Sequence, residues 1–388
     1  MSPRLTSRSP DLLRLVADGY DVVLVDDRLM IRDVPYVMPS REIGRGQLVS
    51  TLELQADVTT PPQDHKAHFI GAEPCDGSGY PLEGIINARG SVALSAGLTA
   101  QFTFSSKPTG GYRDYHHKMT TYIAILESEA QVIDPEATSQ TYPPVADDDP
   151  KSVFRYRDTA STRAGISTVN EHLAGQRIGI VGLGGTGSYI FDQVVKTPVA
   201  EIHMFDRDRF SQHNAFRSPG AATLEELERR PSKVEYLARR YDPMRRGLVP
   251  HPYAVTEENM HELTELDFVF IAIDSDDAKT LIRDALETAD VGFVDVGIGI
   301  DLRDGNRLGG LLRTTLSVPD ARVDIPVGDG GDDIYSANIQ TADLNMLNAA
   351  LAVIAWKRTS GFYDNVEAER TTHYAIDTNE FIREGRSQ

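Results

Sequence analysis

The sequence holds a single cysteine, Cys75, in 388 residues. A lone cysteine excludes disulfides within the chain and any metal cluster made of several thiolates. No apolar run follows Met1, and the longest apolar stretch, near 348–356, is too short to cross a bilayer. We therefore expect a cytoplasmic protein without a signal peptide or a membrane span.

Basic residues are also scarce. The chain has 39 lysines and arginines against 58 aspartates and glutamates, a formal net charge of −19. This surplus argues against nucleic acid or an anionic membrane as partner, although a local basic pocket is compatible with it. The hydrophobic share of 40% is ordinary for a globular protein, and the length suits two domains.

Glycine is concentrated in one stretch, Gly182-Leu-Gly-Gly-Thr-Gly187, which follows the β-branched apolar run 178–181. Gly182 is expected to permit a tight strand-to-helix turn, and Gly184 and Gly185 to let a phosphate approach the backbone. Gly187 would let the helix pack closely on the sheet. The free N–H groups of that helix would then face the anion.

A second apolar run, 202–205, ends in Asp206, 19 residues after Gly187. A carboxylate at this distance is where the ribose-binding acid of a Rossmann-like fold is expected. The two segments together predict a nucleotide site.

The chain divides by composition into two domains. Residues 1–142 are predicted to form a smaller α+β domain, rich in strands, with helices over 11–18 and 115–127. Residues 143–153, rich in proline and aspartate, are predicted to be a linker. Residues 154–388 alternate strands and helices, which is typical of an α/β domain with a mostly parallel, Rossmann-like sheet. The expected strands of this second domain are 177–181, 201–206, 248–255, 267–274, 292–300, an antiparallel 307–318 and 371–376. The expected helices are 154–173, 187–196, 223–240, 257–265, 276–288 and 337–358.

Polar side chains follow Asp206 at high density: Asp208, Asn214 and Arg217 come next, and Lys233 opens a later helix. A dehydrogenase needs little here beyond the ribose acid, because its nicotinamide carries the chemistry. Cations gathered near a phosphate suit phosphoryl or nucleotidyl transfer, in which charge develops there. Adenylate formation meets that description.

Asp274 follows the apolar run 268–273, at the predicted carboxyl edge of the sheet. Carboxylate and phosphate oxygens are the ligands that Mg²⁺ prefers, so Asp274 is the leading metal ligand. Asp276 and Asp277 are better explained as residues that begin a helix.

These residues resemble the adenylation domain of the ThiF, MoeB and ubiquitin-activating enzyme (E1-like) superfamily. The resemblance covers roughly residues 160–355 and rests on five motifs in the family's order: the glycine turn, Asp206 with Asp208, Asn214 with Arg217, Lys233, and Asp274. It implies ATP and Mg²⁺ as cofactors and adenylation of the C-terminal carboxylate of a ubiquitin-like protein.

The resemblance also assigns roles. Asp206 would hold the ribose hydroxyls, Asn214, Arg217 and Lys233 the phosphates, and Asp274 the magnesium. Family dimers use an arginine upstream of the glycine strand that reaches the partner's ATP. Arg163 matches that position and implies a homodimer, the alternative being a solvated helix arginine.

Two features depart from the family. Residues 301–388 contain no cysteine, so the usual thioester and the zinc site of two CxxC pairs are excluded. The reaction either stops at the acyl adenylate, or the acyl group goes to a hydroxyl (Thr314, Thr315, Ser317 or Ser336) or to Cys75. For Cys75 the alternative is a small buried hydrophobic residue.

Residues 1–142 resemble an uncharacterised bacterial domain found ahead of ThiF-like domains, through Asp33-Val-Pro-Tyr, His68-Phe-Ile-Gly and Phe104-Ser-Ser-Lys-Pro. We expect this domain to recognise the protein substrate or a downstream carrier such as a conjugating enzyme. Its histidines, at 65, 68, 116 and 117, are expected to be hydrogen-bonded or solvated, and a metal site is the alternative.

The sequence therefore predicts a nucleotidyltransferase that adenylates the C terminus of a ubiquitin-like protein. A small peptide or a sulfur carrier is the alternative substrate. Two alternatives come from other classes: an NAD-dependent oxidoreductase, which leaves Arg217, Lys233 and Asp274 without a task, and a non-catalytic scaffold.

Overall fold

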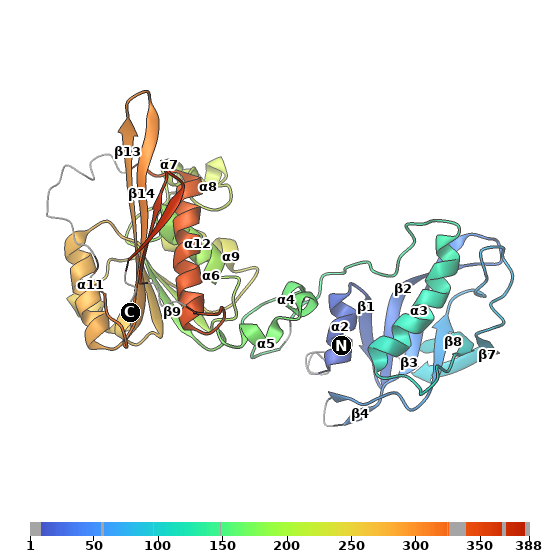
Figure 1. Cartoon of the computed structure of the whole chain (residues 1–388). Helices are drawn as coiled ribbons and strands as arrows, with labels where there is room; N and C mark the ends of the chain where they lie inside the picture. Colours follow the sequence, from blue (N-terminus) through green and yellow to red (C-terminus); the bar gives the residue numbers. More distant parts are fainter. Residues whose placement is uncertain are drawn as a thin grey trace. The chain divides into compact units, whose positions relative to one another are not determined.

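A computed structural model describes residues 9–388 apart from 56–57, 96, 148, 324, 326–338, 367–369 and 385–388. The chain forms two compact units, one of residues up to 152 with 156–166, the other of 153–155 with 167–388 (Figure 1). Residues 156–166 go with the first unit, although the predicted linker ends at 153. The Arg157 N–H donates to Val145 O there, and helix α4 (Thr159–Ala164) packs on α2 (Pro10–Ala17).

The first unit is built on a six-stranded antiparallel sheet in the order β1-β2-β3-β6-β8-β7. Helix α3 (Tyr115–Gln131) packs on β2 and buries Met119, Tyr122, Ile123 and Leu126. The strands are β1 (Asp21–Val25), β2 (Arg28–Val37), β3 (Ile43–Thr51), β6 (Lys66–Ile70), β7 (Ile86–Ser95) and β8 (Leu98–Ser105), with a separate ribbon of β4 (Leu54–Gln55) and β5 (Val58–Thr59).

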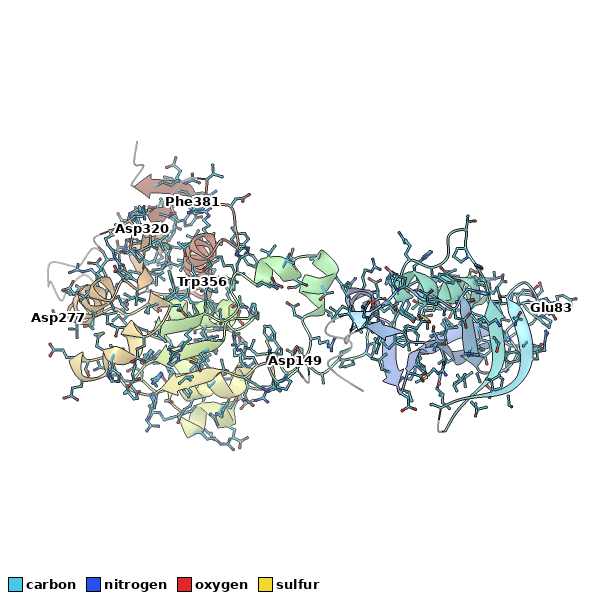
Figure 2. All side chains as sticks on the ribbon, turned by 90° about the horizontal axis from the view of Figure 1, so that it is seen from below. Glu83, Asp149, Asp277, Asp320, Trp356 and Phe381 are labelled. Carbon is cyan, nitrogen blue, oxygen red and sulfur yellow. The ribbon has the colours of Figure 1, made fainter. Side chains whose placement is uncertain are left out.

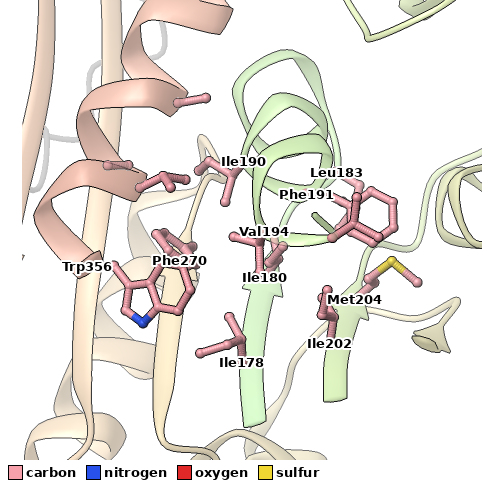
Figure 3. Close-up of a cluster of buried hydrophobic side chains, with 14 of the residues drawn as sticks. Ile178, Ile180, Leu183, Ile190, Phe191, Val194, Ile202, Met204, Phe270 and Trp356 are labelled. Atoms are coloured by element: carbon pink, nitrogen blue, oxygen red, sulfur yellow. The ribbon is translucent and has the colours of Figure 1, made fainter. Parts of the chain in front are cut away.

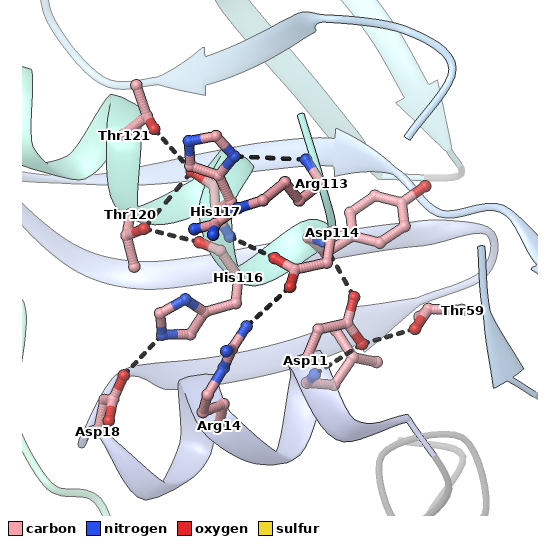
Figure 4. A network of polar contacts seen from close by, with 12 residues as sticks. Asp11, Arg14, Asp18, Thr59, Arg113, Asp114, His116, His117, Thr120 and Thr121 are labelled. Atoms are coloured by element: carbon pink, nitrogen blue, oxygen red, sulfur yellow. Dashed lines mark hydrogen bonds and ion pairs between the residues drawn. The ribbon is translucent and has the colours of Figure 1, made fainter. Parts of the chain in front are cut away.

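Carboxylates tie α2 and α3 of this unit to each other (Figure 4). Asp11 of α2 accepts hydrogen bonds from Thr59 Oγ1 at 2.5 Å and from the Tyr115 N–H at 2.9 Å. Asp114 caps α3 by accepting the His117 N–H at 2.7 Å and pairs with Arg14 of α2 at 2.8 Å. The start of α3 is thus fixed by side chains of α2.

The second unit has an eight-stranded sheet in the order β11-β10-β9-β12-β13-β14-β15-β16. The pairs from β11 to β13 are parallel and those from β13 to β16 are antiparallel. The predicted fold class, a mostly parallel α/β sheet preceded by an α+β unit, is confirmed. The strands are β9 (Arg177–Val181), β10 (Glu201–Phe205), β11 (Leu248–His251), β12 (Phe268–Ile271), β13 (Gly292–Arg303), β14 (Arg307–Ser317), β15 (Thr371–Ala375) and β16 (Glu380–Glu384).

Helices cover both faces of this sheet. On one face α6, α9 and α12 close a core around Ile180, Met204, Phe270 and Trp356 (Figure 3). On the other, α10 and α11 cover Val269 and neighbouring apolar residues. The helices of the unit are α5 (Ser167–Asn170), α6 (Gly185–Val194), α7 (Gln212–Ala215), α8 (Leu224–Arg229), α9 (Lys233–Tyr241), η1 (Glu257–Asn259), α10 (His261–Thr264), α11 (Asp276–Thr288) and α12 (Ala342–Thr359).

Three segments differ from their predictions. The helix expected over 223–240 is two helices, because Arg230 adopts φ 47° before Pro231 and ends α8. The helix expected over 154–173 is only the short α4 and α5. The C-terminal tail contains β16, whose Phe381 is exposed (Figure 2). Across the described parts of the chain, no helix is long and apolar enough to span a membrane.

Lys118 of α3 is a buried lysine that forms no ion pair with a carboxylate of the described residues. The residue is 1% exposed, and its ammonium donates to Ser50 Oγ at 2.8 Å and to Asp64 O at 2.7 Å. Both acceptors are neutral, so burial dominates and lowers the pKa of Lys118 to about 8.

This pKa predicts how stability changes with pH. Between about pH 8 and 10.5 the unfolded chain binds more protons at Lys118 than the folded chain, so Lys118 adds at most about 1.4 kcal/mol per pH unit to the slope of the free energy of unfolding against pH. Lys118→Met should remove this contribution, and Lys66→Met, at an exposed lysine of β6, should keep it. Urea unfolding at pH 7.5, 8.5 and 9.5 measures it; equal slopes in both variants would contradict the assignment.

Candidate functional site

A cavity of about 1000 Å³ lies at the carboxyl edge of the parallel strands and extends over the β13–β14 hairpin. Strands β9, β10 and β12 end at it, with Val181, Phe205 and Ala272 in its wall. Open α/β sheets bind ligands at this edge. The predicted residues that line it are Gly182, Gly184, Gly185, Asp206, Asp208, Arg217, Lys233 and Asp274.

The glycine turn has room for a ligand at one position and no room for a side chain at others. Gly182 adopts φ 88°, and a Cβ there would lie 2.3 Å from Ala272 O. A Cβ on Gly187 would lie 1.8 Å from Gly182 O. At Gly184 no atom stands within 4 Å of that position, and this residue caps α6 without a side chain. The open space beside free N–H groups suits a phosphate oxygen.

Asp206 fixes this turn. It is 9% exposed, and its Oδ2 accepts the Leu183 N–H at 2.7 Å while its Oδ1 accepts the Asp208 N–H at 2.8 Å. Lys233 Nζ lies 3.3 Å from Asp206 Oδ2 and 2.8 Å from Asp208 Oδ2. The Lys233 ammonium holds the pKa of the Asp208 carboxyl below its usual value. The two acids thus hold a buried cation beside the phosphate turn.

Arg217 and Asn214 are placed differently. Arg217 lines the cavity, and its Nε is buried without a hydrogen-bond partner within the described chain. Asn214 is 2% exposed, lies outside the cavity lining, and closes a capping box by accepting the Ser211 N–H at 3.0 Å. Asn214 therefore positions α7, which precedes Arg217, and its contact with phosphate stays a prediction.

Asp274 lies in the exposed loop between β12 and α11 and lines the cavity, as does Asp276. Asp276 and Asp277 occupy the first turn of α11, and Asp277 lies at the surface (Figure 2). Over the ranges that the structure describes, no group of three His, Cys, Asp or Glu is arranged to hold a metal. Mg²⁺ is commonly held by one or two carboxylates plus substrate phosphates, and Asp274, which lines the same cavity as the glycine turn, fits that pattern.

An ion triad beside the cavity is absent from the sequence-based prediction. Asp295 of β13 is fully buried, with Lys279 Nζ at 3.2 Å and Arg313 paired to its other oxygen. Lys279 and Arg313 line the cavity. Burial raises the pKa of Asp295, and the two cations oppose this. The alternation of side chains along β13 and β14 could have indicated that Asp295 and Arg313 lie on one face of the sheet. No local sequence pattern indicates that Lys279 of α11 joins them.

Asp295→Asn should lower the free energy of unfolding by about 3 to 5 kcal/mol, because the buried Lys279 and the partly buried Arg313 then lose the anion between them. Asp301→Asn, at an exposed position of the same strand, should change it by less than about 0.5 kcal/mol. Denaturant unfolding measures both. A similar small effect in the two variants would contradict a structural role for the triad.

Arg163 lies in α4 of the first unit, with its guanidinium 5.2 Å from the ring centre of Tyr142. The cavity belongs to the second unit, so the action of Arg163 on a partner's ATP stays a prediction. The histidines of the first unit bond to neighbours: His65 to Ser105, His68 to Thr103, His116 to Asp18 and His117 to the Arg113 N–H.

Three of the candidate acyl acceptors, Thr314, Thr315 and Ser317, are buried on β14 and do not line the cavity. Ser336 is outside the described residues. Cys75 is 0% exposed, packs with Val37, Ala130 and Ala137, and its backbone bridges to Val37 and Pro81. Burial raises the pKa of its thiol. Both features oppose formation of a thiolate nucleophile.

Cys75 should accordingly react with a disulfide reagent such as DTNB at least about 100-fold more slowly in the native protein than in urea at pH 8, because a shielded thiol of raised pKa is a poor nucleophile. Absorbance of the released thiolate follows the reaction. Comparable rates in the two conditions would restore Cys75 as an accessible acceptor.

The second unit has a Rossmann-like fold with a cavity at the carboxyl edge of its parallel strands. In a comparison with protein families, residues 159–300 match the ThiF family. Residues 10–159 match a domain of unknown function, DUF6791. The predicted resemblance to ThiF is confirmed. A search of curated proteins found no match.

Solved structures similar to the chain include MccB of E. coli with succinimide, at 14% identity and a TM-score of 0.47, over 57% of this chain and 66% of that one. MccB with ATP is 16% identical, with a TM-score of 0.44, over 56% and 67%. PaaA is 13% identical, with a TM-score of 0.44, over 56% and 75%. The alignment thus spans just under two thirds of the first of these chains.

Proposed function

We propose that the chain is an ATP-dependent adenylating enzyme that activates the C-terminal carboxylate of a ubiquitin-like protein, with a small peptide or sulfur carrier as the alternative substrate. The observation that supports this is the gathering of the glycine turn, Asp206, Lys233, Arg217 and Asp274 around one cavity of a ThiF family domain.

Each of these residues has its own role in binding ATP. The open N-terminus of α6 at Gly184 receives a phosphate, and Asp206, already bonded to the turn, accepts from the ribose hydroxyls with its remaining lone pairs. Lys233 leaves the exposed Asp208 for the phosphates, and the unpaired Nε of Arg217 donates to them. Asp274 would hold Mg²⁺, which neutralises phosphate charge when bound.

The chemistry needs no proton transfer from the protein. One oxygen of the substrate carboxylate bonds to the α-phosphorus, the bond from that phosphorus to the oxygen bridging to the β-phosphate breaks, and pyrophosphate leaves with the electron pair. The protein orients the two anions and stabilises the added charge with cations, which is the kind of catalysis this cavity favours. Without a cysteine beyond residue 300, the acyl adenylate is the product, or a separate conjugating enzyme accepts the acyl group.

The proposal includes a homodimer in which Arg163 serves the partner's site, and a recognition role for the first unit. An NAD-dependent oxidoreductase would use Asp206 but neither Arg217, Lys233 nor Asp274 at a cavity wall. Binding of ATP in preference to NAD separates the two classes.

Exchange of labelled pyrophosphate into ATP tests the reaction. The probe is a synthetic peptide that ends in Gly-Gly. The control is the same peptide with an amidated C terminus, which has no carboxylate to react. Exchange should require the free carboxylate, and Asp274→Ala should lower it about 100-fold or more by removing charge neutralisation at the phosphates. Asp277→Ala, three residues on and outside the cavity lining, should retain it. Exchange by the amide, or full activity of Asp274→Ala, would contradict the proposal.

A further inference from the structure

The β13–β14 hairpin gives the cavity a wall with little side-chain cover. Gly297 and Gly299 of β13 line it, together with Leu311 and Arg313 of β14. Gly297 pairs with Arg313 and Gly299 with Leu311, so the four residues share one face of the hairpin. A Cβ on Gly299 would have no atom nearer than Leu311 O at 4.0 Å. The bare backbone of β13 therefore leaves room for an extended polypeptide segment.

Two cations of this wall share a single carboxylate. Lys279 Nζ lies 3.2 Å from one oxygen of Asp295, and Arg313 pairs with the other. Asp295 is 0% exposed, whereas Lys279 and Arg313 line the cavity. The three charges sum to +1, in a chain whose net charge is −19. An anion in the cavity would neutralise the remaining positive charge.

The other charges near the hairpin do not supply that anion. Asp301 lines the cavity, but it is exposed and lies about 13 Å along β13 from Gly297, where solvent screens it. Arg303 lines the cavity too and is paired with Asp377 at 2.9 Å. Asp276, in the first turn of α11, forms no ion pair with the triad among the described residues. The cations of the triad thus remain the place for an anionic group of a ligand.

Strand register locates the triad relative to the glycine turn. Val181, the last residue of β9, pairs with Ile271 of β12, which pairs with Asp295 of β13. The triad is therefore level with the start of the turn and two strands away, about 10 Å across the sheet. A Cβ on Gly297 would lie 3.2 Å from Arg313 Nη2, so the guanidinium lies over β13. Because extended polypeptide advances about 3.3 Å per residue, about three residues would join the turn to the triad.

We propose that Arg313 and Lys279 recognise an acidic side chain of the protein or peptide substrate, about three residues before its C terminus. The inference rests on the proposed function, which brings the reacting carboxylate to the glycine turn. The segment between the two carboxylates would lie on the bare backbone of β13. Guanidinium and ammonium groups only donate hydrogen bonds and a carboxylate only accepts them, so the match is charge-assisted. Arg313 and Lys279 would determine which C terminus is activated, without touching the reacting atoms.

Peptide substrates test this on the unaltered chain. One synthetic peptide ends in Glu-Gly-Gly, its neutral match ends in Gln-Gly-Gly, and a further peptide has the composition of the first with the glutamate moved to its N terminus. In the exchange of labelled pyrophosphate into ATP, the KM for the Glu-Gly-Gly peptide should be about 10-fold lower than for the other peptides. The kcat should agree within about 2-fold. Added salt should reduce the difference in KM, because the contact joins opposite charges.

Arg313→Gln connects this preference to the cavity wall. Lys279 still pairs with Asp295 in the variant, and the ratio of the two KM values should fall to about 2-fold or less while the KM for ATP is unchanged. Arg307→Gln is the matched control, since Arg307 is an exposed arginine of the same strand outside the cavity lining, and it should keep the ratio. If Arg313→Gln does not fold, Arg313→Lys keeps a charge beside Asp295 and should still reduce the ratio, because an ammonium lacks the planar fork of a guanidinium.

Two results would overturn this inference alone: equal KM values for the Glu-Gly-Gly and Gln-Gly-Gly peptides while both support exchange, or a raised KM for ATP in Arg313→Gln, which would assign the triad to the triphosphate. If no peptide with a free carboxylate supports exchange, the proposed function fails as well.

Discussion

One buried carboxylate, Asp206, determines the geometry of the nucleotide end of this molecule. It bonds to the N–H of Leu183 inside the glycine turn, to the N–H of Asp208 beyond its own strand, and to the Lys233 ammonium of α9. Strands β9 and β10 and helix α9 are therefore held by a single side chain. Because the carboxylate is 9% exposed, solvent screens these contacts little, and the turn is organised before any nucleotide arrives.

Strand pairing in the sheet changes from parallel to antiparallel at β13, and the cavity extends over both parts of the sheet. Up to β13 the strands are parallel and end at the phosphate turn, whereas β13 and β14 form a long antiparallel hairpin that continues the cavity wall. A Cβ on Gly299 of this hairpin would meet nothing nearer than Leu311 O at 4.0 Å. Lys279 and Arg313 of the Asp295 triad line the same cavity. The parallel strands and the antiparallel hairpin thus contribute to one continuous cavity wall.

Features with local patterns could be predicted from the sequence. The glycine turn, Asp206 and the alternation of strands and helices depend on residues a few positions apart, and they are as expected. Features that join distant segments could not. Asn345 lies 159 residues from Thr186, its bonding partner. The break of the helix expected over 223–240 had a local signal, Pro231, which outweighs the helical periodicity around it.

The only tryptophan, Trp356, projects from α12 into the core, where it is fully buried against Phe270 and its indole N–H donates to Gln176 at 3.0 Å (Figure 3). The tryptophan fluorescence of the chain therefore comes from the second unit alone. Emission should be shifted to the blue in the native protein and to the red once this core opens, so the melting of one unit can be followed optically without interference from the other.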